Sequence, residues 1–88
     1  MIYNCEALIL SSRPYRDTSL ICNLFSKDYG KITIIAKGAK SIKNPLGAAL
    51  QPLNEIECIY YYKPRRNIQT LKEATIAKKF FKIEENFL

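Results

Sequence analysis

The sequence has no histidine and no tryptophan, and it has only three glycines and three cysteines in 88 residues. Histidine is the most frequent general acid or base of enzymes near neutral pH, so its absence argues against acid–base catalysis. Cys5, Cys22 and Cys58 form no C-x-x-C pair, and no histidine could complete a ligand set with them. We therefore expect no structural zinc site and no other cofactor. The cysteines share their strand phase with apolar neighbours, and we interpret them as small core residues.

Other signatures are missing as well. No apolar run is long enough to span a membrane, and no signal segment precedes the polar residues Asn4 and Glu6. The run Lys37–Lys40 contains one glycine but lacks the spacing of a phosphate-binding Walker loop. Glu55 and Glu57 are interpreted as a solvated strand face. We expect a protein without enzymatic activity, placed in a reducing cytoplasm and not in a membrane.

Positive charge is present and unevenly distributed. The net charge is +6, and no acid lies between Asp28 and Glu55 or between Glu57 and Glu73. Two acid-free basic segments indicate one or two positive patches, whose partner would be nucleic acid or another anionic surface. A lysine-rich surface that is merely solvated is the alternative.

Alternating apolar residues predict five strands. Gly30 stands where a hairpin loop needs a positive φ angle. The first strand becomes apolar on both faces after Ala7, which is typical of a strand that passes from one side of a barrel to the other, and a buried helix is the alternative for so short an apolar run. Ser11 to Ser19 is predicted as a loop containing Pro14. The predicted strands are Ile2–Leu10, Leu20–Phe25, Lys31–Lys37, Asn54–Tyr62 and Ile68 to about Ala77, of which the last would equally suit a helix at Leu71–Ala74.

Two helices are predicted. Asn44 is a good N-cap and Pro45 suits the first helical position, so a helix of one or two turns precedes Pro52, with Leu46 and Leu50 closing the core. Near the end of the sequence, apolar residues at positions i, i+4, i+7 and i+11 form a stripe that predicts a second helix. Its members are Ile76, Phe80, Ile83 and Phe87.

This order of elements is that of an OB-fold, an all-β, five-stranded small barrel with a short helix between strands three and four. A small Sm- or SH3-like barrel is the competing fold. We expect residues 1–78 to form the barrel and residues 79–88 to begin a helix of a following region. The helical stripe has no evident partner in this chain, which we expect to be a fragment.

The sequence also resembles the family of the bacterial recombination mediator RecO. The shared residues are Arg13-Pro14-Tyr15, Ser19-Leu20-Ile21, Tyr29-Gly30-Lys31, Ala36-Lys37-Gly38-Ala39-Lys40, Leu46 to Pro52, and Leu71-Lys72-Glu73-Ala74. The resemblance implies the N-terminal OB domain of a protein of DNA repair, recombination and the DNA damage response. It further implies binding of single- and double-stranded DNA, strand annealing, and work with RecR to load RecA onto DNA coated by single-strand binding protein.

The resemblance also defines what this chain lacks. Family members continue through a helical region that in some of them carries a cysteine zinc site, and the contact with single-strand binding protein is expected there. The family's basic loop residues correspond to Lys37 and Lys40, and Lys43 is added from the charge pattern.

We therefore predict a DNA-binding module without enzymatic activity, cytoplasmic and at the nucleoid during repair. The alternative is a protein-interaction OB domain that presents an open strand edge or Tyr60–Tyr62, with lysines that serve only solubility. The candidate nucleic-acid-binding residues are Arg13, Tyr15, Arg16, Lys37, Lys40, Lys43, Lys63, Arg65 and Arg66.

Overall fold

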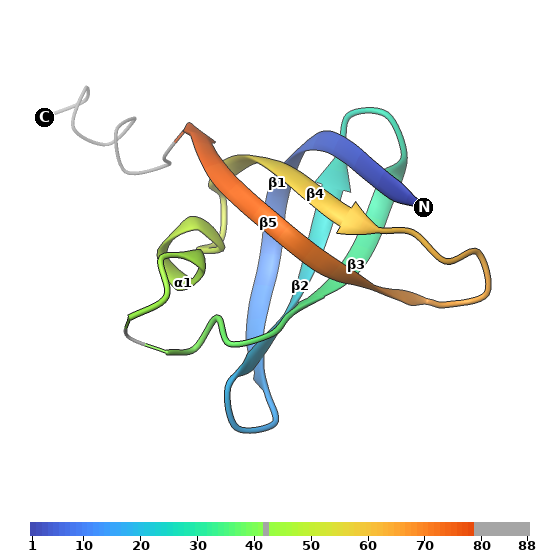
Figure 1. Ribbon diagram of the computed structural model, residues 1–88. Helices are drawn as coiled ribbons and strands as arrows, with labels where there is room; N and C mark the ends of the chain where they lie inside the picture. Colours follow the sequence, from blue (N-terminus) through green and yellow to red (C-terminus); the bar gives the residue numbers. More distant parts are fainter. Residues whose placement is uncertain (42, 79–88) are drawn as a thin grey trace, which may run out of the picture.

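The computed structural model describes residues 1–41 and 43–78, which form a closed barrel with strand order β1-β2-β3-β5-β4 (Figure 1). One short helix, α1, lies between the third and fourth strands, as the sequence predicts for an OB-fold. The elements are β1 (Ile2–Tyr15), β2 (Ser19–Ser26), β3 (Gly30–Ala36), α1 (Leu46–Ala49), β4 (Glu55–Tyr61) and β5 (Ile68–Lys78).

Strand β1 is longer than predicted, and most of the expected loop at Ser11–Ser19 is strand. Residues 2–8 of β1 pair with β4, residues 7–15 pair with β2, and the register shifts between Ile9 and Ser11. Pro14 is tolerated because this part of β1 pairs with β2 alone, and proline is accommodated where one side of a strand is unpaired. The predicted passage of β1 from one side of the barrel to the other is confirmed.

The barrel closes through a short parallel ladder between β3 and β5. Three residue pairs form it: Thr33 with Ile68, Ile34 with Gln69, and Ile35 with Thr70. The other ladders are antiparallel. The segment predicted as either strand or helix at Leu71–Ala74 is therefore strand.

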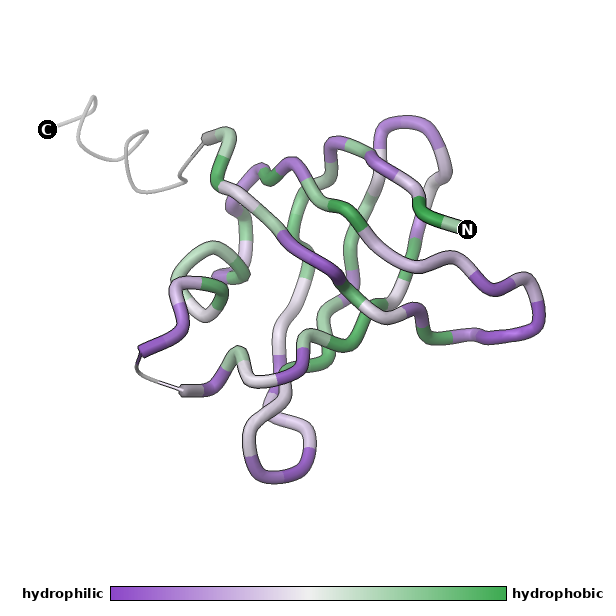
Figure 2. Tube along the Cα trace, in the orientation of Figure 1, coloured by the Kyte–Doolittle hydropathy of each residue, from purple (hydrophilic) through white to green (hydrophobic). Residues whose placement is uncertain are grey.

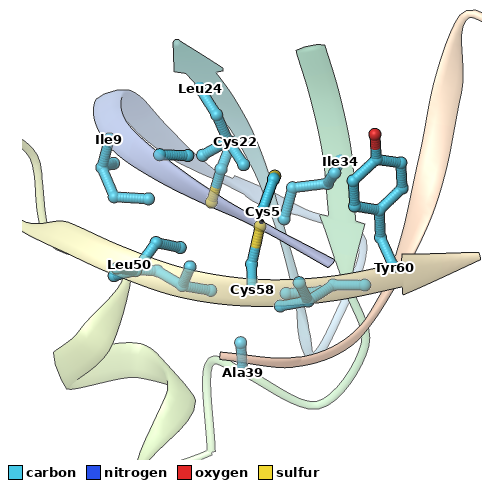
Figure 3. Packing of buried hydrophobic residues seen from close by; sticks show 13 residues of the cluster. Cys5, Ile9, Cys22, Leu24, Ile34, Ala39, Leu50, Cys58 and Tyr60 are labelled. Atoms are coloured by element: carbon cyan, nitrogen blue, oxygen red, sulfur yellow. Dashed lines mark hydrogen bonds between the residues drawn. The ribbon is translucent and has the colours of Figure 1, made fainter. Parts of the chain in front are cut away.

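The core consists of alternate residues of the strands together with Ala39, which lies between β3 and α1, and Leu50, which follows α1 and closes one end. Cys5, Cys22 and Cys58 are buried free thiols, as predicted, and the Sγ atoms of Cys5 and Cys58 lie 3.4 Å apart (Figure 3). The remaining core residues are Ala7, Ile9, Leu24, Ile34, Ala36, Ile56, Tyr60 and Leu71.

Helix α1 starts one residue later than predicted. Pro45 is the cap residue, and Asn44 contributes by accepting a hydrogen bond from the Leu46 N–H at 2.9 Å. At the other end, the buried Asn54 side chain donates to the carbonyls of Ala48 and Ala49, each at 3.2 Å. Those carbonyls lack intrahelical partners, so Asn54 fastens the helix to the start of β4.

The predicted terminal stripe is only partly described. Ile76 lies in β5 opposite Ile56, so it does not belong to a helix, because the β4–β5 ladder continues to Lys78. Phe80, Ile83 and Phe87, and with them the predicted helix at 79–88, lie outside the described residues. Within residues 1–41 and 43–78 no helix has the length and apolarity needed to cross a membrane.

Candidate nucleic-acid interface

The outward side chains of β1, β2 and β3 form regular rows across the sheet. Ser11, Asn23 and Thr33 are joined by two hydrogen bonds: Asn23 Nδ2 donates to Ser11 Oγ at 3.0 Å, and Thr33 Oγ1 donates to Asn23 Oδ1 at 2.8 Å. The next row contains Arg13, Ile21, Ile35 and Thr70 in register, and within it the Ile21 side chain is buried. Because of this register, the side chains on the outer face of β2 and β3 have fixed positions relative to one another.

Six of the predicted residues gather at one end of this face, and we call them the hairpin cluster. Arg13, Tyr15 and Arg16 come from the end of β1 and the turn into β2. Arg16 has a φ angle of 57°, and its guanidinium carbon lies 5.3 Å from the centre of the Tyr15 ring, in cation–π range. Lys37, Lys40 and Lys43 come from the segment between β3 and α1, and all six residues are exposed.

A backbone hydrogen bond joins the two halves of the hairpin cluster. The N–H of Lys40 donates to the carbonyl of Thr18 in the β1–β2 turn at 2.9 Å. In Figure 1 the β1–β2 hairpin accordingly lies beside the segment that leaves β3. Two basic segments that are far apart in the sequence thus meet at one end of the barrel, and Asp17 is the acid within them.

The segment that carries the three lysines is anchored, although Gly38 separates it from the sheet. Gly38 has a φ angle of 76°, and its carbonyl accepts hydrogen bonds from Ser41 N and from Asn44 Nδ2. Ala39 is buried, and a Cβ atom at Gly47 would lie only 2.7 Å from the Ala39 carbonyl oxygen. Residue 47 must therefore be glycine for α1 to pack against this segment.

The other three predicted residues, Lys63, Arg65 and Arg66, occupy the loop between β4 and β5, and we call them the β4–β5 cluster. The loop is braced by the buried Gln69. Its Oε1 accepts from Lys63 N at 2.9 Å, and its Nε2 donates to the carbonyls of Lys63 and Arg66 at 3.0 and 2.9 Å. The basic side chains of this loop are exposed.

The two clusters are separate and are linked by the outer face of β2 and β3. In Figure 1 the β4–β5 loop projects on the right, away from the β1–β2 hairpin at the bottom, and Figure 2 shows both as hydrophilic stretches. The row from Arg13 reaches Thr70, which follows the β4–β5 loop. The predicted residues therefore lie at opposite ends of one sheet face, as in the loops and face by which OB-folds bind oligonucleotides.

Exposed aromatic rings are divided between this face and other parts of the barrel. Tyr15 is 36% exposed within the hairpin cluster, whereas Phe25 is 58% exposed and lies beside Leu8 and Lys31, near the other end of β2. Tyr3 stacks on both Tyr29 and Tyr62, with ring centres 5.1 and 4.5 Å apart. Tyr15 is exposed and carries a cation–π contact with Arg16 inside the hairpin cluster, which favours it for stacking on a base.

The sequence did not reveal the residues that hold these loops in place. The strand pattern predicts that Gln69 lies in a strand, but it does not predict that its side chain braces the loop. The amide side chain of Gln69 gives only a weak indication in the sequence. A buried amide needs several hydrogen-bond partners, and the partners of Gln69 are backbone groups of a loop. In the part of the chain that the structure describes, no three His, Cys, Asp or Glu side chains gather closely enough to hold a metal ion.

The chain is similar in sequence to known proteins. A family model described as Recombination protein O N terminal matches residues 1–80. DNA repair protein RecO of Salinibacter ruber is 38% identical over 84 residues, which are 96% of this chain and 32% of that protein. The RecO proteins of Chlorobaculum parvum and Vibrio parahaemolyticus are 36% and 39% identical over 89% and 78% of this chain, and over 30% and 28% of their own lengths. The chain thus spans about a third of the length of these relatives.

Proposed function

Because the chain belongs to the recombination protein O family, we propose that it is the DNA-binding domain of a recombinational repair protein. It binds single- and double-stranded DNA largely without sequence preference and has no catalytic activity of its own. The hairpin cluster and the β4–β5 cluster hold phosphates, and the outer face of β2 and β3 lies along the strand. The protein acts in the cytoplasm, at the nucleoid during repair.

The observation that carries this proposal is the hydrogen bond between Lys40 and Thr18. It joins the segment that carries Lys37, Lys40 and Lys43 to the turn that follows Arg13 and Arg16, and Asp17 is the acid of these two segments. Such a concentration of charge attracts a polyanion, and neutralised phosphates release their counterions on binding.

The resemblance to recombination mediators suggests partners. We propose that this domain supports strand annealing, and that with a RecR-type protein it helps place RecA on DNA coated by single-strand binding protein. Calorimetric titration of this chain with a RecR-type protein tests the direct contact. The contact with single-strand binding protein is not assigned to residues 1–88.

The double variant Lys37→Gln and Lys40→Gln tests DNA binding. Each phosphate contact contributes about 0.7 to the slope of log affinity against log salt concentration for single strands, so losing two flattens the slope by about 1.4. The measurement is fluorescence anisotropy with a labelled single-stranded oligonucleotide over a range of salt concentrations. Thermal stability should change little, because both lysines are exposed.

The matched control is Lys27→Gln with Lys72→Gln. These two lysines are also exposed, they lie outside both basic clusters, and their loss changes the net charge by the same amount. The control should keep most of the slope. If both variants lose slope equally, binding follows overall charge and the hairpin cluster is not the interface.

A further inference from the structure

Tyrosine rings gather at the end of the barrel away from α1, and we call Tyr3, Tyr29 and Tyr62 the tyrosine stack. The Tyr3 ring stacks on Tyr29 and on Tyr62, with ring centres 5.1 and 4.5 Å apart and interplanar angles of 29° and 10°. In Figure 1 the β2–β3 turn, the start of β1 and the end of β4, which carry these residues, accordingly lie together on the side away from α1. None of the candidate nucleic-acid-binding residues belongs to this stack.

The backbone of Tyr29 is held in place although it lies in a turn. Its N–H donates to Ser26 Oγ at 2.9 Å, and the same hydroxyl donates to the carbonyl of Gly30 at 2.8 Å. Ser26 is itself buried, and Gly30 supplies the φ angle of 71° with which the turn enters β3. The turn therefore presents the Tyr29 ring from a fixed backbone.

The rest of the stack is anchored in the core. Tyr3 and Tyr62 are partly buried and pack against the core cluster, and the Tyr3 ring meets buried Tyr60 edge-on at 5.8 Å. Tyr29 is 49% exposed, and its contact with Tyr3 covers one face of its ring. A ring that is supported on one face and open on the other loses little freedom when a flat ligand stacks on it.

The charges near the tyrosine stack indicate which flat ligand it fits. Tyr62 directly precedes Lys63, the first cation of the β4–β5 cluster, so phosphates can be held beside the stack. Asp28 directly precedes Tyr29, and its carboxylate repels phosphate at the turn itself. A single strand satisfies both conditions when its phosphates lie on the β4–β5 cluster and a base lies on Tyr29.

We propose that Tyr29 stacks on a base of single-stranded DNA whose phosphates are bound by the β4–β5 cluster. The tyrosine stack lies beyond the outer face of β2 and β3, so it extends the path of the strand past that cluster. Bases of a duplex are already stacked on one another, so the site serves single strands alone. This inference rests on the proposed function.

The test measures affinity by fluorescence anisotropy for two labelled oligonucleotides of about 16 nucleotides, one of thymidines and one in which the same backbone carries abasic sites. Tyr29→Ala should weaken binding of the thymidine oligonucleotide about 5- to 150-fold, the range for the loss of one base stack. Binding of the abasic oligonucleotide and of duplex DNA should change by less than about twofold, because their phosphate contacts remain. Tyr29→Phe keeps the ring and should keep the affinity.

The matched control is Leu53→Ala, which removes another exposed apolar side chain, in the segment between α1 and β4. It should leave both affinities unchanged. A direct readout in the unaltered chain does not depend on how any variant folds. In the complex with the thymidine oligonucleotide we expect nuclear Overhauser effects between thymine methyl groups and the ring protons of Tyr29.

The outcomes separate this inference from the proposed function. Equal losses for the thymidine and abasic oligonucleotides mean that Tyr29 only shapes the turn, and they overturn the proposal. An unchanged affinity of Tyr29→Ala without Overhauser effects overturns it as well. If binding depends on Lys37 and Lys40 but not on Tyr29, the tyrosine site alone is wrong. If the unaltered chain binds neither oligonucleotide, the proposed function fails and this inference falls with it.

Discussion

The Sγ atoms of Cys5 and Cys58 meet across the β1–β4 ladder inside the core. Burial raises the pKa of both thiols and of Cys22, and burial together with Cys5 raises the pKa of Cys58 to about 12. A protonated thiol is a weak nucleophile and a weak metal ligand. These cysteines therefore serve the barrel as compact apolar side chains.

Because of its buried cysteines, the barrel should become less stable at alkaline pH. A thiol of the unfolded chain loses its proton near pH 8.5, whereas folded Cys58 keeps its proton up to about pH 12. The unfolded state therefore binds fewer protons between these values, and the free energy of unfolding should fall as pH rises through this window. Tyr60, whose pKa burial also raises to about 12, adds to the fall above about pH 10.

Urea midpoints measured from pH 7.5 to 10.5 check this expectation. The midpoint should be level at the lower end and decline above about pH 8.5. In the variant Cys58→Ala the decline should be shallower, although the variant is less stable throughout. A midpoint of the unaltered barrel that does not change over this range contradicts the assignment of Cys58 as a buried protonated thiol.

The packing of α1 against the segment between β3 and α1 depends on one glycine, Gly47. In an exposed helix, replacing glycine with alanine stabilises by about 1 kcal/mol. At Gly47 the added Cβ would lie 2.7 Å from the carbonyl oxygen of Ala39, so we expect Gly47→Ala to destabilise the barrel by about 1–3 kcal/mol. Chemical denaturation measures the difference. As a control, Ala48→Gly, at an exposed position of the same helix, should lower the stability by about 0.5–1 kcal/mol. If Gly47→Ala instead stabilises the barrel, the close approach of residue 47 to the Ala39 carbonyl is absent.

At the scale of elements, strand periodicity predicted which residues of a strand point into the core. Cys5, Ala7 and Ile9 alternate with outward residues, and their burial follows from the period of a strand. The second half of β1 was missed because Ser11, Ser12 and Pro14 have the composition of a loop. Pairing with β2 overrides that local preference, and Ser12 reaches the Cys22 sulfur at 3.4 Å.

In the candidate site, too, some properties could be predicted from the sequence and others could not. Exposure and charge of the eight basic residues could be predicted, because long charged side chains rarely leave solvent. The exposure of Tyr15 could not, because a tyrosine at this position would equally cover the core. Their grouping could not, since Lys40 reaches Thr18 and Gln69 reaches Lys63 through hydrogen bonds between distant segments. No local pattern contains those contacts.

For the whole molecule, the two basic clusters predict how DNA length affects binding. Only a strand long enough to cross the outer face of β2 and β3 can contact both, and OB-folds occupy about 4–16 nucleotides. With a long oligonucleotide, Arg65→Gln with Arg66→Gln should flatten the salt slope by about 1.4, in addition to the loss caused by the Lys37 and Lys40 changes. With a very short oligonucleotide the two losses should not add. Equal additivity at every length would mean that the clusters bind independently.

Closure of the barrel by β3 and β5 has a consequence for its synthesis on the ribosome. The hairpins of β1, β2 and β3 are complete once residue 36 has emerged, but the closing strand runs from Ile68 to Lys78. At about 5–20 residues per second, several seconds separate these events. During that interval the nascent chain presents Cys22, Leu24 and Ile34 on an unfinished sheet with an unpaired β3 edge, so the barrel is most vulnerable to aggregation before its last strand is translated.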